Sequence, residues 1–468
     1  MFIKSIFTNS FGILVSRIFG FIRDLLTASI LGANIYSDIF FVAFKLPNLF
    51  RRIFAEGAFT QSFLPTFAKS KQKSYFATAI FIRFFIILTI LSILVTIFDT
   101  FFTKLIAFGF SKELIKEAAP LVAINFYYLL LIFCVTFLAT LLQYKNHFAT
   151  TAFSTALLNI SIICALLFSK GLSPKVIVYY MSYAVIVGGI MQLFVHIIAI
   201  KKLHLERIFI YGFLHLKRLK GEKKGLKSFY RVFMPSILGN STAQISAFVD
   251  TFLATFLASG AISYLYYANR IFQLPLALFA IATSVAIFPN ITKHIKNGDE
   301  KSALLITRKS FWFLSYLLTL STVGAIVLSK EIIWLLFQRG AFNEIDTQNT
   351  ALVLSMYILG LLPFGITKIF SLWLYAKHRQ KRAAFISSIS LGVNILLSFL
   401  LIFSLKAAGL ALASSLSGFV LFYLTIKEFG INDFLDIIRD KKALYLLLLV
   451  IVEIVVLLIF KGFIDVYL

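Results

Sequence analysis

Charge is scarce in this sequence, and acidic charge is the scarcest. Only 14% of its 468 residues are charged, and 20 acidic residues face 45 Lys and Arg. Hydrophobic residues make up 60% of the chain, including 54 Phe, and the mean hydropathy is +0.92. A soluble domain of this length could not cover its surface with so few polar residues. The chain is therefore expected to be a polytopic membrane protein.

The residues used by many enzymes and redox proteins are also nearly absent. There are two cysteines, Cys134 and Cys164; each falls within a hydrophobic stretch without a CxxC motif, so we expect packing roles. The six His show no HExxH or HxxxH spacing, which argues against a zinc site. No Walker sequence and no DDxxD-like acidic cluster is present, which argues against ATP-driven transport and against Mg²⁺-dependent polyprenyl-phosphate enzymes. We predict no enzyme activity and no cofactor other than a coupling ion.

Apolar windows of about twenty residues recur along the chain, as transmembrane helices require. Barrel strands would show ten-residue alternation instead. The sequence thus predicts an all-α fold with about thirteen spans. We place them at 6–31, 37–66, 76–98, 119–142, 149–168, 176–200, 229–257, 262–290, 305–328, 350–375, 383–403, 407–426 and 443–461.

The basic residues predict an orientation. With a cytoplasmic N-terminus, 27 Lys and Arg fall in inside segments and nine in outside segments. Such an excess follows the positive-inside rule, and it places the C-terminus in the periplasm. The net charge of +25 therefore reflects membrane orientation, and no nucleic-acid partner is expected. Arg17 and Arg23 interrupt the first hydrophobic stretch, so we do not expect it to be a cleaved signal peptide.

The chain also repeats itself. Gly32-Ala33 and Leu46-Pro47 recur 228 residues later as Gly260-Ala261 and Leu274-Pro275, while Lys145 and Asn159 match Lys377 and Asn394. An offset of six helices keeps the orientation, so we predict two six-helix bundles related by a pseudo-twofold axis along the membrane normal. The predicted parts are a first lobe at 1–200, a basic cytoplasmic linker at 201–228, a second lobe at 229–428 and an additional helix at 429–468.

Ionisable residues crowd the first two spans, where lipid exposure would cost about 2.5–3.5 kcal/mol for each charge. They are expected to line a wet cavity. Arginine donates in a planar fork that suits phosphate, so the cationic excess predicts a large anionic ligand. A second interpretation is structural: Arg52 and Glu56 pair at i, i+4, and Arg51 snorkels to an interface. The ionisable residues of these spans are Arg17, Arg23, Asp24, Asp38, Lys45, Arg51, Arg52 and Glu56.

Three segments carry a family resemblance: SRIFGFIRD at 16–24, FFVAFKLPNLFRRIFAEGAFTQSFLP at 40–65, and FLASG with YYANRIFQLP within 256–275. They closely resemble the MurJ (MviN) family of bacterial lipid II flippases, within the multidrug, oligosaccharidyl-lipid and polysaccharide (MOP) exporter superfamily. The resemblance spans nearly the whole chain. It departs from the family at Asn269, where members often carry an acid, and in having thirteen expected helices where members often have fourteen.

The resemblance implies transport of lipid II from the cytoplasmic to the periplasmic leaflet of the inner membrane, by alternating access, for peptidoglycan biosynthesis and cell shape. It implies that Arg17, Arg23, Arg52 and Arg270 bind the pyrophosphate and that Asp24 orients Arg23 and Arg270. Asp38, Lys45, Arg51 and Glu56 match further polar cavity positions. The implied partners are lipid II, membrane lipids and cell-wall synthesis proteins.

Transport without ATP requires an ion gradient or the membrane potential. Asp250, Asn394, Ser398 and Ser414 supply oxygen ligands for a sodium-like ion, and similar positions form a sodium site in some family members. Two alternatives remain: a proton as coupling ion, and an Asp250 that pairs with an Arg.

Two other functions remain open from the sequence. One is a related MOP-superfamily transporter of another lipid-linked oligosaccharide. The other is a cation-coupled drug exporter, which the excess of arginine disfavours because cationic drugs call for acidic and aromatic walls.

Overall fold

The computed structural model describes residues 2–53, 58–215 and 223–467. Glu56 lies outside these ranges, and of Arg52 only the backbone is described. Within them the chain is helical and contains no strand, as the composition predicted. The chain folds into two compact units, Met1–Ser259 and Gly260–Leu468.

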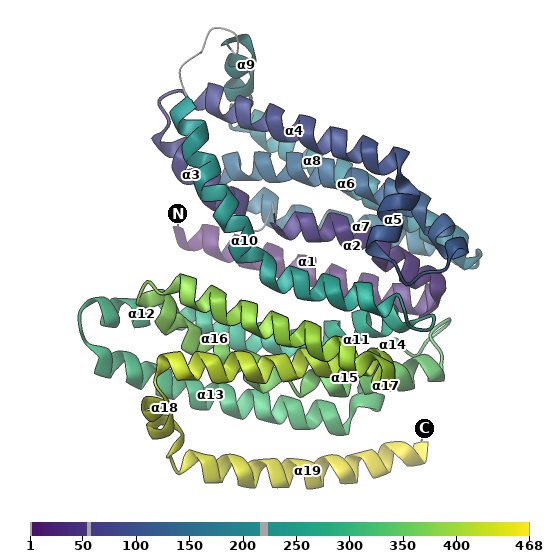
Figure 1. The fold of residues 1–468 in the computed structure, drawn as a ribbon, viewed down its shortest axis with the longest axis vertical. Coiled ribbons are helices and arrows are strands. Elements are labelled where there is room, and N and C mark those ends of the chain that lie inside the picture. The colour runs from purple at the N-terminus through teal and green to yellow at the C-terminus, as the bar shows by residue number, and fades with distance from the viewer. Residues whose placement is uncertain (1, 54–57, 216–222, 468) are drawn as a thin grey trace. The chain divides into compact units, whose positions relative to one another are not determined.

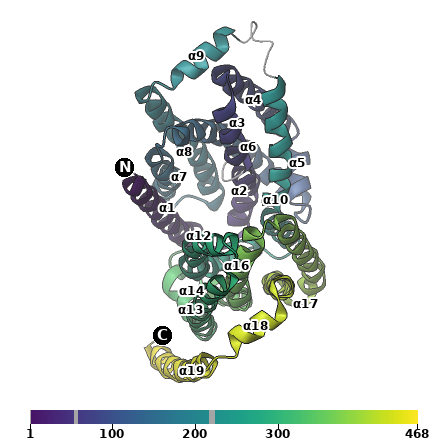
Figure 2. The same ribbon diagram turned by 90° about the vertical axis from the view of Figure 1, so that its left-hand side faces the viewer.

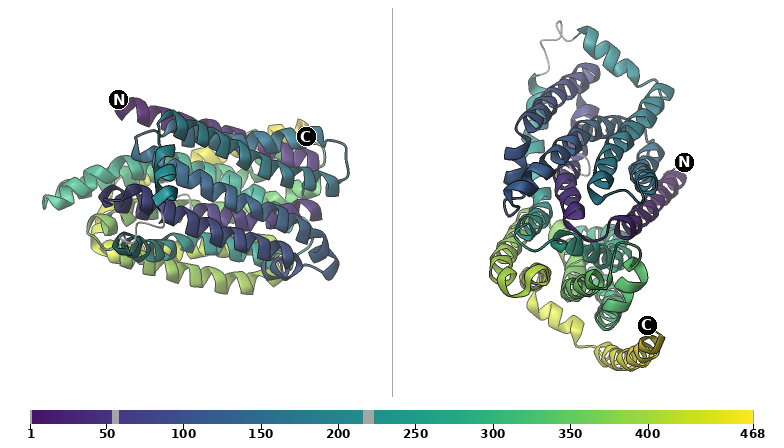
Figure 3. Two further views of the ribbon diagram at one scale, coloured as in Figure 1. Left: turned by 90° about the horizontal axis from the view of Figure 1, so that it is seen from above. Right: turned by 90° about the vertical axis from the view of Figure 1, so that its right-hand side faces the viewer.

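The long helices of the first unit run side by side as a bundle (Figures 1 and 3). They are α1 (Phe2–Leu31), α2 (Ile35–Ile53), α3 (Phe59–Lys69), α4 (Lys73–Ile97), α5 (Asp99–Ile106), α6 (Lys112–Tyr144), α7 (Ala149–Phe168), α8 (Pro174–Lys202), α9 (Glu206–His215) and α10 (Lys223–Ala254).

The second unit is a bundle with one helix, α19, at its outer side (Figures 1 and 2). Its elements are α11 (Ala261–Pro275), a π-helical segment (Leu276–Ile281), α12 (Ala282–Lys296), α13 (Glu300–Val327), α14 (Ser329–Phe337), α15 (Glu344–Ile358), α16 (Leu361–Ala376), α17 (Gln380–Phe429), α18 (Ile431–Ile438) and α19 (Lys442–Tyr467).

Nine helices in the described ranges are long and apolar enough to span a membrane, so the predicted number of thirteen is not confirmed. One source of the difference is α17, which joins the predicted spans 383–403 and 407–426. Lys406 interrupts it with non-helical angles, φ 52° and ψ −131°. Ser390 Oγ donates to the Ser417 carbonyl at 2.8 Å, so the chain reverses at this kink and α17 forms two adjacent arms.

A proline marks a change of helix geometry within the predicted span 262–290. Pro275 is followed at once by the π-helical segment Leu276–Ile281. A proline lacks the amide hydrogen that a regular turn requires, and π turns are one way to accommodate the lost bond. The predicted span 262–290 thus consists of α11, the π-helical segment and α12.

The repeat noted in the sequence has a local structural counterpart. Asn146 and His378, which follow the matched lysines, both have positive φ, 58° and 56°. The next amide then bonds to a carbonyl five residues back, from His147 to Leu142 and from Arg379 to Leu374. This is the Schellman geometry of a helix end. The matched segments therefore end α6 and α16 in the same way.

Aromatic packing places α10 in the first unit. Phe229 and Phe233 of α10 lie 5.9 and 6.3 Å from Phe59 of α3, measured between ring centroids. Phe233 also lies 5.4 Å from Phe84 of α4, at a near-perpendicular angle. Edge-to-face pairs of this kind stabilise packing beyond their buried area. The boundary after Ser259 thus differs from the predicted lobe boundary at 228/229, which was drawn from the repeat and stays a prediction about internal symmetry.

Polar contacts at its two ends attach α19, whose most apolar window has no buried residue. Near its start, Arg308 of α13 pairs with Asp440 at 3.1 Å and Tyr316 donates to the Lys442 carbonyl at 2.8 Å. Near its end, Lys461 pairs with Glu331 of α14 at 3.2 Å. The Lys442 amide and then the Arg308 guanidinium keep the pKa of Asp440 below its ordinary value.

Close helix packing in the first unit depends on a glycine, which yields a stability test. A Cβ at Gly188 of α8 would lie 2.8 Å from the Leu158 Cα of α7, whereas one at Gly392 would meet nothing within 4 Å. Overpacking costs about 1–3 kcal/mol. We expect Gly188→Ala to lower the apparent melting temperature in detergent, and Gly392→Ala to leave it unchanged or raise it. Equal melting temperatures for the two variants would contradict this packing.

Candidate functional site

A buried arginine with two polar partners forms the centre of the site in the first unit. Arg23 of α1 is 9% exposed and Asp24 is 1% exposed. Asp24 Oδ1 accepts hydrogen bonds from Arg23 Nε at 3.0 Å and from Nη2 at 2.6 Å. Asn159 Oδ1 of α7 accepts a third, from Nη1 at 3.0 Å. Asp24 and Asn159 therefore hold the guanidinium, and the Asp24 carboxylate partly neutralises it.

Asn159 also fixes the helix that carries this arginine. Its Nδ2 donates to the Ser16 carbonyl of α1 at 3.1 Å, so one amide holds both the backbone of α1 and the head of Arg23. α1 and α7 pack along their lengths, and Gly12 permits close approach, because a Cβ there would lie 2.7 Å from Ala152 Cβ. The position of Arg23 thus follows from the packing of two helices.

The contact between Arg23 and Asp24 concerns the role that was expected for Asp24. Adjacent residues on a helix point in different directions, yet the long Arg23 side chain reaches Asp24 with two nitrogens. The expected orientation of Arg23 by Asp24 is present as a contact. A buried ion pair also serves as a structural element, so the role of Arg23 in binding a substrate stays a prediction.

The other predicted residues of the first unit lie on α1 and α2. Arg17 is exposed, six residues before Arg23 on the same helix, while Asp38 is 2% exposed. Lys45 and Arg51 are half-buried, and Arg51 Nε donates to Asn48 Oδ1 at 3.1 Å. Arg51 therefore makes a local hydrogen bond, and the extension of its side chain to the membrane interface stays a prediction. The predicted Arg52–Glu56 pair lies outside the part of the chain whose side chains are described.

In the second unit, Arg270 of α11 is half-buried. Its guanidinium lies 5.7 Å from the ring centroid of Tyr266, one turn earlier, in a cation–π arrangement. Asn269, which stands where family members often have an acid, accepts a hydrogen bond from Gln273. The Arg270 guanidinium therefore lies next to an aromatic ring.

The predicted sodium ligands are divided between the units. Asp250 is buried on α10, and Asn394, Ser398 and Ser414 lie on the two arms of α17. Asn394 Nδ2 donates to Ser414 Oγ at 3.1 Å. Ser398 is fully buried, and its Oγ has no hydrogen-bond partner within the described ranges. Among those residues, no group of three or more His, Cys, Asp or Glu is positioned to hold a metal.

Lys368 is a lysine within the predicted span 350–375 that no sequence motif marked as a site residue. Its side chain is exposed, although Thr367 and Ile369 beside it are buried. No hydrogen bond or ion pair joins it to any residue that the structure describes. Because an unpaired cation facing lipid is costly, the open side of α16 is expected to face water. The signal was present in the sequence as one of nine basic residues within spans.

Asn159 was also missed as a site residue. The sequence showed only its repeat match to Asn394. Its partner Arg23 is 136 positions away in the chain, and helix packing alone brings the two side chains together.

These features define a class: a helical, multi-pass membrane transporter with charged side chains inside its membrane helices. A multidrug transporter of the MATE family, in an inward-facing conformation and of the MOP superfamily, has a similar fold, with a TM-score of 0.68 at 12% identity over 92% of this chain and 98% of that chain. At that identity the likeness concerns the fold alone.

The family follows from closer matches. The family model "Lipid II flippase MurJ" matches residues 27–467. A Helicobacter pylori protein named "Probable lipid II flippase MurJ" is 52% identical over 448 residues, covering 94% of this chain and 97% of its own. One from Buchnera aphidicola with the same name is 34% identical over 475 residues, covering 97% and 89%. A solved structure, "Lipid II flippase MurJ, inward closed conformation", has a TM-score of 0.79 at 26% identity, covering 97% of this chain and 98% of its own.

The chain belongs to the MurJ family of lipid II flippases. Membership confirms the predicted family, the all-helical polytopic membrane class and a transporter in place of an enzyme.

The exposure of Lys368 gives a test of its role. We expect Lys368→Met to leave the melting temperature unchanged and to reduce transport about tenfold, the effect of losing one charge-assisted hydrogen bond to a ligand. Growth of cells depleted of their own flippase measures this. Lys170→Met, which removes an exposed loop charge, is the matched control. Full growth with Lys368→Met would show that Lys368 does not contact the transported ligand.

Proposed function

We propose that this protein translocates lipid II, undecaprenyl-pyrophosphate carrying a disaccharide-pentapeptide, from the cytoplasmic to the periplasmic leaflet of the bacterial inner membrane. The N-terminus is proposed to be cytoplasmic and the C-terminus periplasmic, from the distribution of basic residues. Cell-wall enzymes that make and consume lipid II are the expected partners. The names of its relatives and its family model support the substrate.

One observation in the structure supports this proposal: the Arg23 guanidinium, on the membrane helix α1, is buried and is held by the side chains of Asp24 and Asn159. A pyrophosphate must leave water to cross the bilayer, and fixed guanidinium groups replace part of its hydration. A side chain already ordered by its neighbours loses little further entropy when it binds. The Arg23 guanidinium is therefore suited to meet a pyrophosphate with low reorganisation.

The remaining cations have complementary roles in the proposal. Arg17, Arg52 and Arg270 share the pyrophosphate with Arg23, because one guanidinium balances only part of its charge. Lys45 and Arg51 add positive potential along the path, and Asp38 and Glu56 limit its strength so that the ligand is released. The polyprenyl tail remains in lipid while the headgroup crosses by alternating access.

For coupling, we propose that sodium binds Asp250, Asn394, Ser398 and Ser414. A sodium ion prefers oxygen ligands, and the buried Ser398 Oγ lacks a hydrogen-bond partner in the described part of the chain. A buried hydroxyl without a partner is costly, and an ion would satisfy it. Asn394 lies one turn earlier on the same arm, and its Nδ2 makes the bond to Ser414, so its amide oxygen is the ligand assigned to the ion.

The direct test is the accessibility of new lipid II to an externally added degrading enzyme, in cells depleted of their own flippase. We expect the wild type to restore exposure, and Arg17→Ala and Arg270→Ala to lose most of it at equal membrane levels. Arg207→Ala is the matched control, since Arg207 is exposed on the short helix α9, which is not one of the nine membrane-spanning helices of the described ranges, and belongs to no proposed site. No restoration by the wild type would point to another lipid-linked oligosaccharide.

The same assay separates coupling from binding. Asp250→Asn and replacement of external sodium by potassium should each reduce the rate of exposure. If sodium replacement has no effect but dissipating the proton gradient stops exposure, the coupling ion is a proton and the sodium assignment fails.

A further inference from the structure

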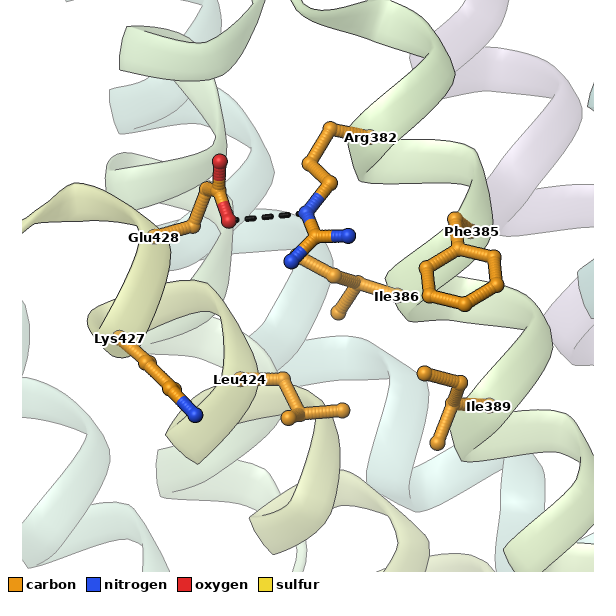
Figure 4. A pocket seen from close by; sticks show the side chains of 7 residues that line it. All are labelled: Arg382, Phe385, Ile386, Ile389, Leu424, Lys427 and Glu428. Carbon is orange, nitrogen blue, oxygen red and sulfur yellow. Dashed lines mark hydrogen bonds and ion pairs between the residues drawn. The ribbon is translucent and has the colours of Figure 1, made fainter.

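A cavity of about 180 Å³ lies between the two arms of α17, toward the ends remote from the kink at Lys406. Figure 4 shows the side chains that line it, with Arg382, Phe385 and Ile389 on one arm and Leu424, Lys427 and Glu428 on the other. The cavity belongs wholly to the second unit. None of its residues is assigned to the proposed transport or coupling sites.

The polar end of this cavity carries excess positive charge. Glu428 accepts hydrogen bonds from Arg382 Nε at 2.9 Å and from Arg379 Nη1 at 3.4 Å. These two bonds leave both terminal nitrogens of Arg382 and the Lys427 ammonium without an acceptor among the residues described. Arg379 and Arg382 thus share one carboxylate. The terminal nitrogens of Arg382 and the Lys427 ammonium remain as donors for an anion.

The other end of the cavity is apolar. Phe385 and Ile389 are 54% and 37% exposed, and they follow Arg382 along the same arm toward the middle of the span. The Arg382 guanidinium lies 5.5 Å from the Phe385 ring centroid, so charge and apolar surface meet at this point. Leu424 supplies the facing wall. Along each arm, the charged residues stand nearer the end of the helix and the apolar residues stand further in.

This order matches a phospholipid, whose phosphate lies at the membrane surface and whose acyl chains extend inward. Basic pockets between membrane helices bind anionic headgroups in this way. The cavity is smaller than the roughly 300–1,000 Å³ of pockets for drug-sized ligands. It therefore has room for a phosphate group, whereas a disaccharide-pentapeptide headgroup is too large.

We propose that the cleft between the arms of α17 binds an anionic phospholipid, with the phosphate on Arg382 and Lys427 and an acyl chain along Phe385, Ile389 and Leu424. The occupant is a bilayer lipid such as phosphatidylglycerol, and it is not the transported substrate. Bound there, the lipid joins the two arms, which the protein itself connects at this end through Glu428. The proposal stands apart from the transport function.

Lipid titration of the full-length protein in neutral detergent, followed by native mass spectrometry, tests it. Each basic residue near a membrane surface contributes about a fivefold gain in binding of an anionic lipid. We expect phosphatidylglycerol to bind more tightly than phosphatidylcholine, and Arg382→Gln/Lys427→Gln to weaken phosphatidylglycerol about 25-fold. Lys427→Gln alone should weaken it about fivefold. The Lys427 ammonium pairs with no other described side chain. We therefore expect Lys427→Gln to leave the fold unchanged, so that a loss of lipid binding can be assigned to the lost charge.

The control is Lys301→Gln/Lys381→Gln, which removes two exposed charges outside the cavity. Retained phosphatidylglycerol binding in this control supports the site. Equal loss in both double variants would reduce the effect to general surface charge and overturn the proposal, as would equal binding of the two lipids. Competition by millimolar inorganic phosphate, with phosphatidylglycerol displaced, would mark a site for a soluble anion and would likewise overturn it.

Discussion

The cost of burying an arginine in a membrane is the constraint on which the rest of this structure depends. A guanidinium inside the hydrocarbon region must have partners or water, and Arg23 has Asp24 and Asn159. That requirement sets where α7 must lie relative to α1. It also explains why a carboxylate directly follows the arginine in the sequence. A charge satisfied in this way stays ordered, and an ordered charge is a good receptor for a pyrophosphate.

The packing around this group supplies the rigidity that it needs. Hydrophobic burial offers little between helices in lipid, so close packing and dispersion must hold them. In the first unit, small residues such as Gly12 and Gly188 let backbones approach, and clustered rings such as Phe59, Phe84 and Phe233 join α3, α4 and α10. The second unit uses polar ties at the ends of α19 and a single kinked residue, Lys406, between the arms of α17.

The sequence predicted what local composition determines. Apolar windows predicted an all-helical membrane protein, although the number of thirteen spans is not confirmed. The segments that carry the matched Lys145 and Lys377 end their helices in the same way. Intramembrane charge singled out Arg23 and Asp24, which are buried; their role in binding a substrate stays a prediction. The sequence did not predict that Asn159 holds Arg23, because that contact depends on how α1 and α7 pack. It did not predict that α10 packs in the first unit, because the Phe229 and Phe233 partners are far away in the chain. The sequence showed that Lys368 lies within a span, but it did not show that its side chain is exposed.

The most direct test of the central claim is a double-mutant cycle on Arg23 and Asp24, with unfolding stability in detergent and lipid II exposure in cells measured for each variant. Breaking a buried ion pair costs about 3–5 kcal/mol, whereas removing both charges is far less costly. We expect Arg23→Gln and Asp24→Asn each to lower stability, and the double variant to recover it while lipid II exposure stays lost. Recovery of both stability and exposure in the double variant would show that the pair serves only the fold, and would contradict the assignment of Arg23 to the substrate.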